Sequence, residues 1–102
     1  MSLDIQPPQQ PGTGTNAAAQ VTISNASATI IAARSGRRGV LVINYQTVAV
    51  YVDPSGGTAA TTHLRLDPGA GLYLPVTSAI TGITSAAYTA SADAKVHTIE
   101  LF

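Results

Sequence analysis

Four short runs of β-forming residues lie in the stretch GVLVINYQTVAVYVDPSGGTAATTHLRLDPGAGLYL, which spans Gly39 to Leu74. The runs are Gly39–Tyr45, Val48–Val52, His63–Leu66 and Gly71–Leu74. Turn-forming residues (Gly, Pro, Asp, Gln, Thr) separate them, and this spacing is typical of antiparallel strands. The stretch therefore predicts an all-β fold.

The same pattern continues on both sides of this stretch. Further strands are expected at Val21–Ser24, Ala28–Ala32, Ala79–Ile83, Ala86–Ala90 and Val96–Leu101. Regularly spaced strands with turns between them indicate an antiparallel β-sandwich, of jelly-roll or immunoglobulin-like type, over residues 20–102. Helix is not expected, except for one turn around Asn16–Gln20.

Alternation within the runs predicts which side chains face the core. Val40–Ile43 is apolar throughout, as expected for a strand covered on both faces by the opposing sheet or by another chain. Leu64 and Leu66 are expected to point inward with Arg65 outward, and Leu72–Leu74 repeats this pattern around Tyr73. The link 67–71 has turn chemistry that predicts a hairpin of these two strands. In the last strand, alternation separates His97, Ile99 and Leu101 from Val96, Thr98 and Glu100.

Charged residues are scarce in this chain of 102 residues. They make up 10% of it, against about 25% in an ordinary domain, and hydrophobic residues make up 45%. None occurs from Ile5 to Ala33 or from Pro68 to Ala92. Such surfaces suit packing against other protein, because a partly buried charge must be desolvated or paired. The alternative is a Thr-rich surface that is polar without being charged.

Several classes of function are not expected from the residue inventory. The net charge is zero, so the basic field used in non-specific nucleic-acid binding is missing. Cysteine is absent, and His63 and His97 lie in separate strands without clustered carboxylates, so no metal site or cofactor is expected. Asp53 and Asp67 each precede Pro, which indicates turn chemistry. We therefore expect no enzyme and no small-molecule substrate.

No segment has the pattern of a signal for secretion or of a membrane span. The N-terminal residues lack a basic start and an apolar run, and no later apolar stretch is long enough to cross a bilayer. We expect synthesis in a host cytoplasm and no membrane partner.

Residues 1–19 are rich in Pro, Gln and Gly and form an expected extended arm before the sandwich domain. Pro7, Pro8 and Pro11 remove backbone donors and disfavour regular structure. The arm is either a disordered tail or a segment that becomes ordered by lying across a neighbouring subunit. In the second case these prolines are candidate partner-binding residues.

The other candidate binding residues are three arginines and one tyrosine. Arg34, Arg37 and Arg38 hold three of the five basic residues. They form either a solvated hairpin end or a guanidinium patch that binds carboxylates on a partner. Tyr73 is the candidate interface anchor, while Tyr45 and Tyr51 are expected in the sheet or core.

Five segments in order carry a resemblance to a known family. They are ATIIAA (residues 28–33), RRGVLVIN (residues 37–44), VYV (residues 50–52), LRLDPG (residues 64–69) and KVHTIE (residues 95–100). In this order the segments resemble the small all-β virion structural proteins of tailed bacteriophages. The Tyr45–Thr47 turn and the loop from Asp53 depart from the usual pattern, so binding details do not carry over.

The resemblance implies a capsid cement (decoration) protein, or the capsid-binding base of a head fibre. The expected partner is the major capsid protein, bridged and stabilised on the capsid exterior of the virion. Self-association, with a trimer favoured, is expected because sandwich edges need cover. The alternatives are a receptor- or glycan-binding fibre module and a neck or tail adaptor of the same virion.

Overall fold

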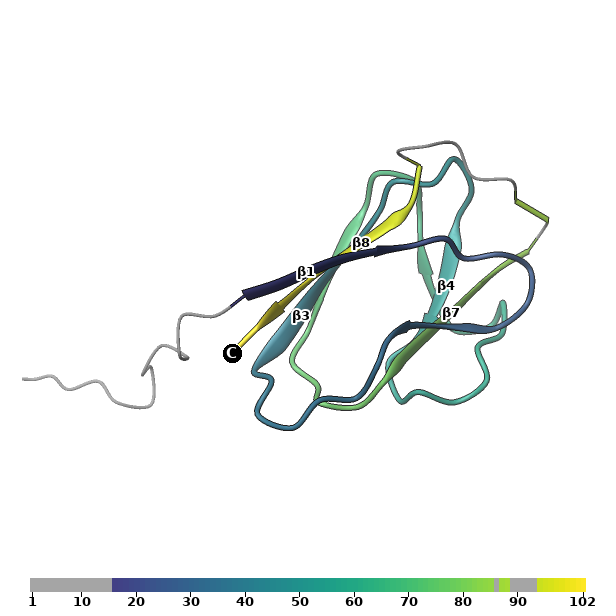
Figure 1. The fold of residues 1–102 in the computed structure, drawn as a ribbon. Helices are drawn as coiled ribbons and strands as arrows, with labels where there is room; N and C mark the ends of the chain where they lie inside the picture. Colours follow the sequence, from purple (N-terminus) through teal and green to yellow (C-terminus); the bar gives the residue numbers. More distant parts are fainter. Residues whose placement is uncertain (1–15, 86, 89–93) are drawn as a thin grey trace, which may run out of the picture.

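The structure is a computed structural model that describes residues 16–85, 87–88 and 94–102. Within these residues eight strands form two antiparallel sheets (Figure 1). Sheet A has the order β1 (Asn16–Val21), β8 (Val96–Leu101), β3 (Gly39–Asn44), β6 (Gly71–Leu74). Sheet B has the order β2 (Ala28–Ile31), β7 (Ile80–Thr84), β4 (Val50–Asp53), β5 (Leu64–Leu66). None of the described residues lies in a helix of the length and apolarity that a bilayer crossing requires.

The strand pairing is that of a jelly roll. β1 pairs with β8, β2 with β7, β3 with β6 and β4 with β5, all antiparallel. The chain is thus one antiparallel ribbon, with its tip between β4 and β5, wound so that successive pairs lie in alternate sheets. Pairing of β8 with β3 and of β7 with β4 completes the sheets. This order decides between the two sandwich topologies that the sequence leaves open.

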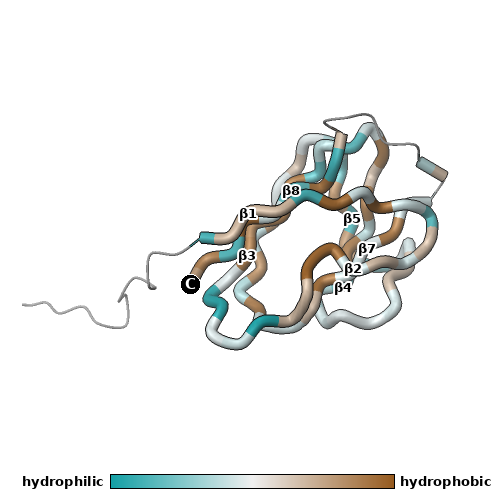
Figure 2. Tube along the Cα trace, viewed as in Figure 1, coloured by the Kyte–Doolittle hydropathy of each residue, from teal (hydrophilic) through white to brown (hydrophobic). Residues whose placement is uncertain are grey.

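The core lies between the two sheets and is aliphatic. Figure 2 shows strongly hydrophobic segments along the strands and paler colours in most connecting loops. Burying each such side chain contributes about 1.5–3 kcal/mol relative to leaving it in water. The buried cluster consists of Ile23, Ile30, Val40, Val42, Val50, Val52, Leu66, Leu74, Ile80 and Val96.

The prediction for the start of the domain is wrong. Residues 16–19, expected in the arm, belong to β1, which pairs without interruption along β8, and no helical turn forms there. The strand expected at Val21–Ser24 ends at Val21. Backbone pairing with β8 overrides the helix propensity of the three alanines. The arm to residue 15, with Pro7, Pro8 and Pro11, lies outside the described residues, as does most of the strand expected at Ala86–Ala90.

The predicted turn at residues 67–70 is confirmed, but the predicted hairpin is wrong. The Ala70 amide donates to the Asp67 carbonyl at 2.9 Å, and Gly69 has φ of 83°. However, β5 pairs with β4 and β6 pairs with β3, so the link crosses from one sheet to the other. Its Gly69 amide donates to the Asn44 carbonyl at the end of β3. Leu64, expected inside, is 48% exposed because it begins an edge strand.

Asp53 gives a prediction about acid stability. Its Oδ1 accepts hydrogen bonds from the Ser55 hydroxyl (2.6 Å) and the Ser55 amide (2.9 Å), and these lower the pKa of Asp53. A pKa lower in the folded state stabilises the fold above about pH 4, and this stabilisation is lost as the pH falls through the folded value. We expect Asp53→Asn to flatten the fall in unfolding free energy between about pH 5 and pH 2. Urea titrations across that range measure it, and an unchanged slope would contradict the assignment.

Candidate functional site: the outer face of sheet A

The outer face of sheet A carries no acidic or basic side chain other than a histidine in its described residues. Along each strand alternate residues point to the core, and the others point outward. We call these outward residues the outer face of sheet A. They are Asn16, Ala18 and Gln20 of β1, His97, Ile99 and Leu101 of β8, Gly39, Leu41 and Ile43 of β3, and Gly71 and Tyr73 of β6.

An apolar row crosses all four strands of this face. Ala18 lies opposite Ile99, Ile99 opposite Leu41, and Leu41 opposite Tyr73. Ile99 is 38% exposed and Tyr73 is 50% exposed, although both side chains are large and mainly apolar. Leu41, between them, is half-buried, and an apolar row with two large exposed side chains marks a surface suited to contact with another molecule.

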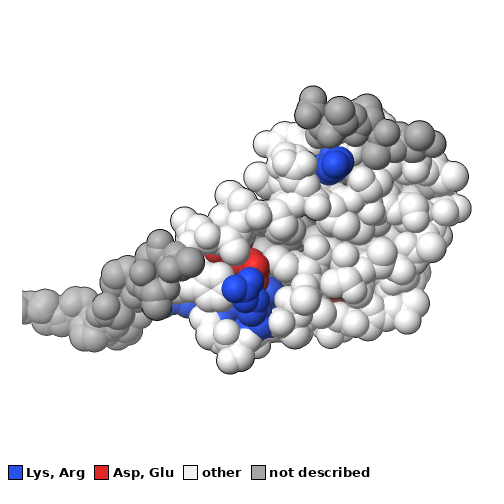
Figure 3. All heavy atoms as spheres, in the orientation of Figure 1, with Lys and Arg blue, Asp and Glu red and all other residues white. Residues whose placement is uncertain are grey.

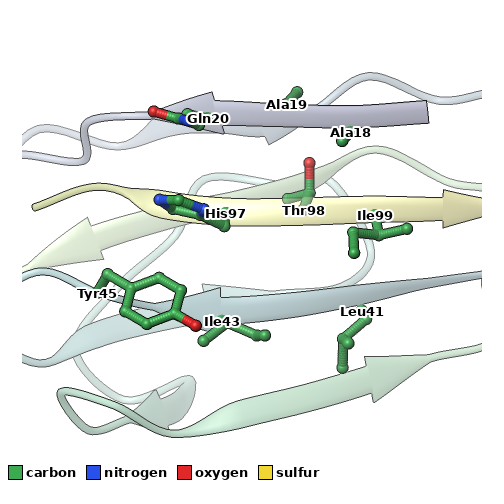
Figure 4. Close-up of a pocket in the computed structure, with 9 residues that line it drawn as sticks. All are labelled: Ala18, Ala19, Gln20, Leu41, Ile43, Tyr45, His97, Thr98 and Ile99. Carbon is green, nitrogen blue, oxygen red and sulfur yellow. The ribbon is translucent and has the colours of Figure 1, made fainter. Parts of the chain in front are cut away.

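A hollow of about 270 Å³ lies beside this row (Figure 4). Leu41, Ile43 and Ile99 line it, together with Tyr45 and His97. The Tyr45 and His97 rings meet edge to face, with centroids 4.6 Å apart. Nε2 of His97 is buried, and the described residues offer it no hydrogen-bond partner. Thr98 also lines the hollow, and its buried hydroxyl likewise has no partner among the described residues, so the wall of this largely apolar depression includes two residues with an unsatisfied polar atom.

Tyr73 has the outward orientation that alternation predicts. It lies against Gly39, where an added Cβ would collide with the Tyr73 hydroxyl. The glycine therefore gives the ring a place to lie flat on the sheet, while half of the residue remains exposed. Tyr45, expected in the sheet or core, is instead 51% exposed at the margin of the same face.

The outer face of sheet B differs from that of sheet A. Thr29 and Thr81 are opposite one another, and the neighbouring row joins Ile83, Tyr51 and Arg65. Arg65 donates to Asp67 at 2.6 Å and to the Tyr51 hydroxyl at 3.0 Å. These polar and charged groups are compatible with water, so the outer face of sheet B, unlike that of sheet A, carries an exposed ion pair.

Arg37 does not lie at the surface. Its side chain is fully buried, and its guanidinium donates to Oε1 of Glu100 at 3.1 Å and to three backbone carbonyls. These carbonyls belong to Ala32, Val76 and Ser78. Neither alternative considered for the arginines, a solvated hairpin end or a patch that binds a partner's carboxylates, therefore describes Arg37, because its guanidinium is buried against the chain's own Glu100 carboxylate.

The other two arginines lie nearer to solvent. Figure 3 shows blue and red atoms gathered near the start of β3, with a wide white surface around them. The Arg34 side chain is 54% exposed, pairs with Oε2 of Glu100 at 3.1 Å, and lies 4.8 Å from the centre of the Phe102 ring. Arg38 is exposed, and its amide donates to the Leu101 carbonyl. A role for Arg34 and Arg38 in partner binding stays a prediction.

The two histidines lie in different parts of the sandwich. His63 precedes β5 of sheet B, where its Nδ1 accepts the Ala60 amide, whereas His97 belongs to sheet A. In the part of the chain that the structure describes, no group of three His, Cys, Asp or Glu residues is placed to hold a metal ion.

The outer face of sheet A is the feature that sequence reasoning missed. Alternation placed Tyr73 and Ile99 each on one side of their own strand, and Val40–Ile43 was expected to be covered on both faces, but nothing in the sequence indicates that these strands share a sheet. Comparisons with protein-family models, with curated proteins and with solved structures gave no match for this chain.

Proposed function

We propose that the chain is a non-enzymatic structural protein that docks on another protein through the outer face of sheet A. The observation that carries this proposal is the absence of Asp, Glu, Lys and Arg from that face in the described part of all four strands. Small domains normally cover solvent-facing sheet surfaces with charge, as sheet B does with Arg65 and Asp67.

The cost of removing water from a partner's surface determines which partners an uncharged face can bind. A partner with an uncharged, partly apolar surface loses little hydration on contact, whereas a charged one must bury unpaired charge. Exposed Tyr73 and Tyr45 provide the rigid aromatic groups that anchor protein interfaces. The partner is therefore expected to be a folded protein, not a polyanion.

The partner we propose is the major capsid protein of a tailed bacteriophage, bound on the capsid exterior. The jelly roll occurs in viral capsid proteins but also in lectins and cupins, so the fold alone does not choose. The order of the segments that resemble virion proteins favours the capsid. A protein that binds only the assembled shell stabilises it by mass action, which is the action of a cement protein.

A matched pair of substitutions tests the docking face. Ile99 and Ile83 each lie on the outer face of a central strand, one in sheet A and one in sheet B. We expect Ile99→Lys to weaken binding to purified empty capsids of the encoding phage about 30-fold or more, since about 2 kcal/mol or more is lost when a charge is buried unpaired. Ile83→Lys should bind like the unchanged chain. Co-sedimentation with capsids measures both.

Copy number separates the proposed role from its alternatives. A cement protein binds saturably, with a stoichiometry set by the capsid lattice, whereas a neck or tail adaptor is present in a few copies per particle. A glycan-binding fibre module would show a ligand-dependent rise in melting temperature. Absence of the chain from purified particles, or equal loss of binding in both lysine variants, would overturn the proposal.

A further inference from the structure

Three of the four sheet edges carry features that prevent pairing with another chain. β6 is directly followed by Pro75, β2 has a shift of register between Thr29 and Ile31, and β5 has three residues, of which Arg65 is charged. Proline, bulges, charge and shortness are the means by which proteins protect exposed edges from added strands. These edges are therefore unsuitable for pairing.

The fourth edge, β1, carries none of these features in its described residues. It has six residues, Asn16–Val21, with the sequence NAAAQV, which holds neither a charge nor a proline. Its register with β8 is unbroken from Asn16 to Val21. Among the described strands β1 pairs only with β8, so its other side presents a row of backbone donors and acceptors to which none of these strands bonds.

We propose that β1 pairs antiparallel with β1 of a second copy of the chain, about a two-fold axis at Ala18. In this register Ala18 lies opposite Ala18 of the second copy, and Asn16 opposite its Gln20. Directly opposite residues in an antiparallel pair share a face, so each Asn carboxamide meets a Gln carboxamide and each methyl meets a methyl. Five of the six residues of β1, Asn16–Gln20, are symmetric in type about Ala18, and this self-complementarity is what selects a second copy as the occupant.

Pairing at this edge has a consequence for the outer face of sheet A. A two-fold axis perpendicular to the sheet joins two copies of sheet A into one continuous sheet and puts both outer faces on the same side. The uncharged surface is then doubled. The inference does not depend on the proposed function, because it concerns the purified chain alone. A two-fold pair also differs from the trimer expected from the sequence, so the measured mass distinguishes them.

Charge substitution at Ala18 tests the pairing in the full-length chain. Sedimentation equilibrium of the unchanged protein should give twice the chain mass of 10.4 kDa. In Ala18→Lys and in Ala18→Glu, like charges meet across the two-fold axis, so the dimer dissociation constant should rise about tenfold or more. An equimolar mixture of the two variants places Lys opposite Glu and should restore the dimer.

A control variant in β2 and a hydrogen-exchange measurement on β1 test the two-fold pairing further. Thr29→Lys puts the same charge on an exposed position of the edge strand β2 and should leave the dimer unchanged. Amide hydrogen exchange of the unchanged chain should slow in residues 16–21 as protein concentration rises. A monomer or a trimer, a mixture that fails to restore the dimer, or exchange in β1 that is independent of concentration would each overturn the two-fold pairing.

Discussion

Arg37→Ala is expected to destabilise the fold by about 3–5 kcal/mol, the cost of removing one partner from a buried ion pair. The substitution removes the donor of four hydrogen bonds and leaves the Glu100 carboxylate buried beside only Arg34. In a domain of this size each kcal/mol shifts the melting temperature by about 4–8 °C, so a fall of roughly 12–40 °C is expected. Thermal and urea unfolding measure it.

Arg34→Ala is the matched control for this prediction. Arg34 binds the same carboxylate at the same distance of 3.1 Å, but its side chain is 54% exposed. An exposed ion pair contributes only about 0–1 kcal/mol, so this variant should unfold close to the unchanged chain. In a double-mutant cycle, Glu100→Gln should cost much less when Arg37 is already absent. Equal effects of the two arginine substitutions would show that burial does not set the strength of this pair.

Most of the strands and their inward residues could be predicted, because the alternation of inward and outward side chains along a strand depends only on neighbouring residues. The pattern in Val96–Leu101 separates the buried Val96, Thr98 and Glu100 from the outward residues, as the structure has them. Prediction failed where a distant strand decides the structure. The link 67–71 has the residues of a tight turn, but whether β5 and β6 pair with each other depends on β3 and β4, which compete for them.

The environment of the arginines lay beyond local reasoning for the same reason. Arg37 and Glu100 are 63 residues apart in the sequence, and only the pairing of β3 with β8 brings them together. Three arginines around a glycine turn look alike in sequence, yet one is buried and the others lie at the surface. The scarcity of charge likewise suggested a covered surface, while the register of four strands was needed to locate the uncharged face.

Substitution of Gln46 is expected to have the second large effect on stability. The side-chain amide of Gln46 makes the two hydrogen bonds to Ile23 that the backbone of a neighbouring strand would otherwise make. It lies between β3 and β4 and is 2% exposed. Its Oε1 accepts the Ile23 amide at 2.8 Å, and its Nε2 donates to the Ile23 carbonyl at 3.1 Å. These two bonds fix Ile23 in the crossover from β1 to β2, next to Ser24, whose carbonyl accepts the Thr84 amide of β7. Gln46→Ala leaves both Ile23 groups unsatisfied and should cost about 2–5 kcal/mol in urea unfolding.

Gln46→Glu distinguishes this pairing from simple filling of space, because it keeps the shape and changes the donor. An ionised glutamate side chain at this position can accept the Ile23 amide but cannot donate to the Ile23 carbonyl, so the neutral carboxyl is favoured in the fold and its folded pKa is raised. Stability linked to a raised carboxyl pKa is present at low pH and is lost as pH rises above the unfolded value of about 4.3. Relative to the unchanged chain, Gln46→Glu should therefore be least destabilised near pH 4 and most destabilised near pH 7, in urea titrations at about these two values. A loss of stability that is the same at both pH values would mean that the Ile23 carbonyl does not need the donor.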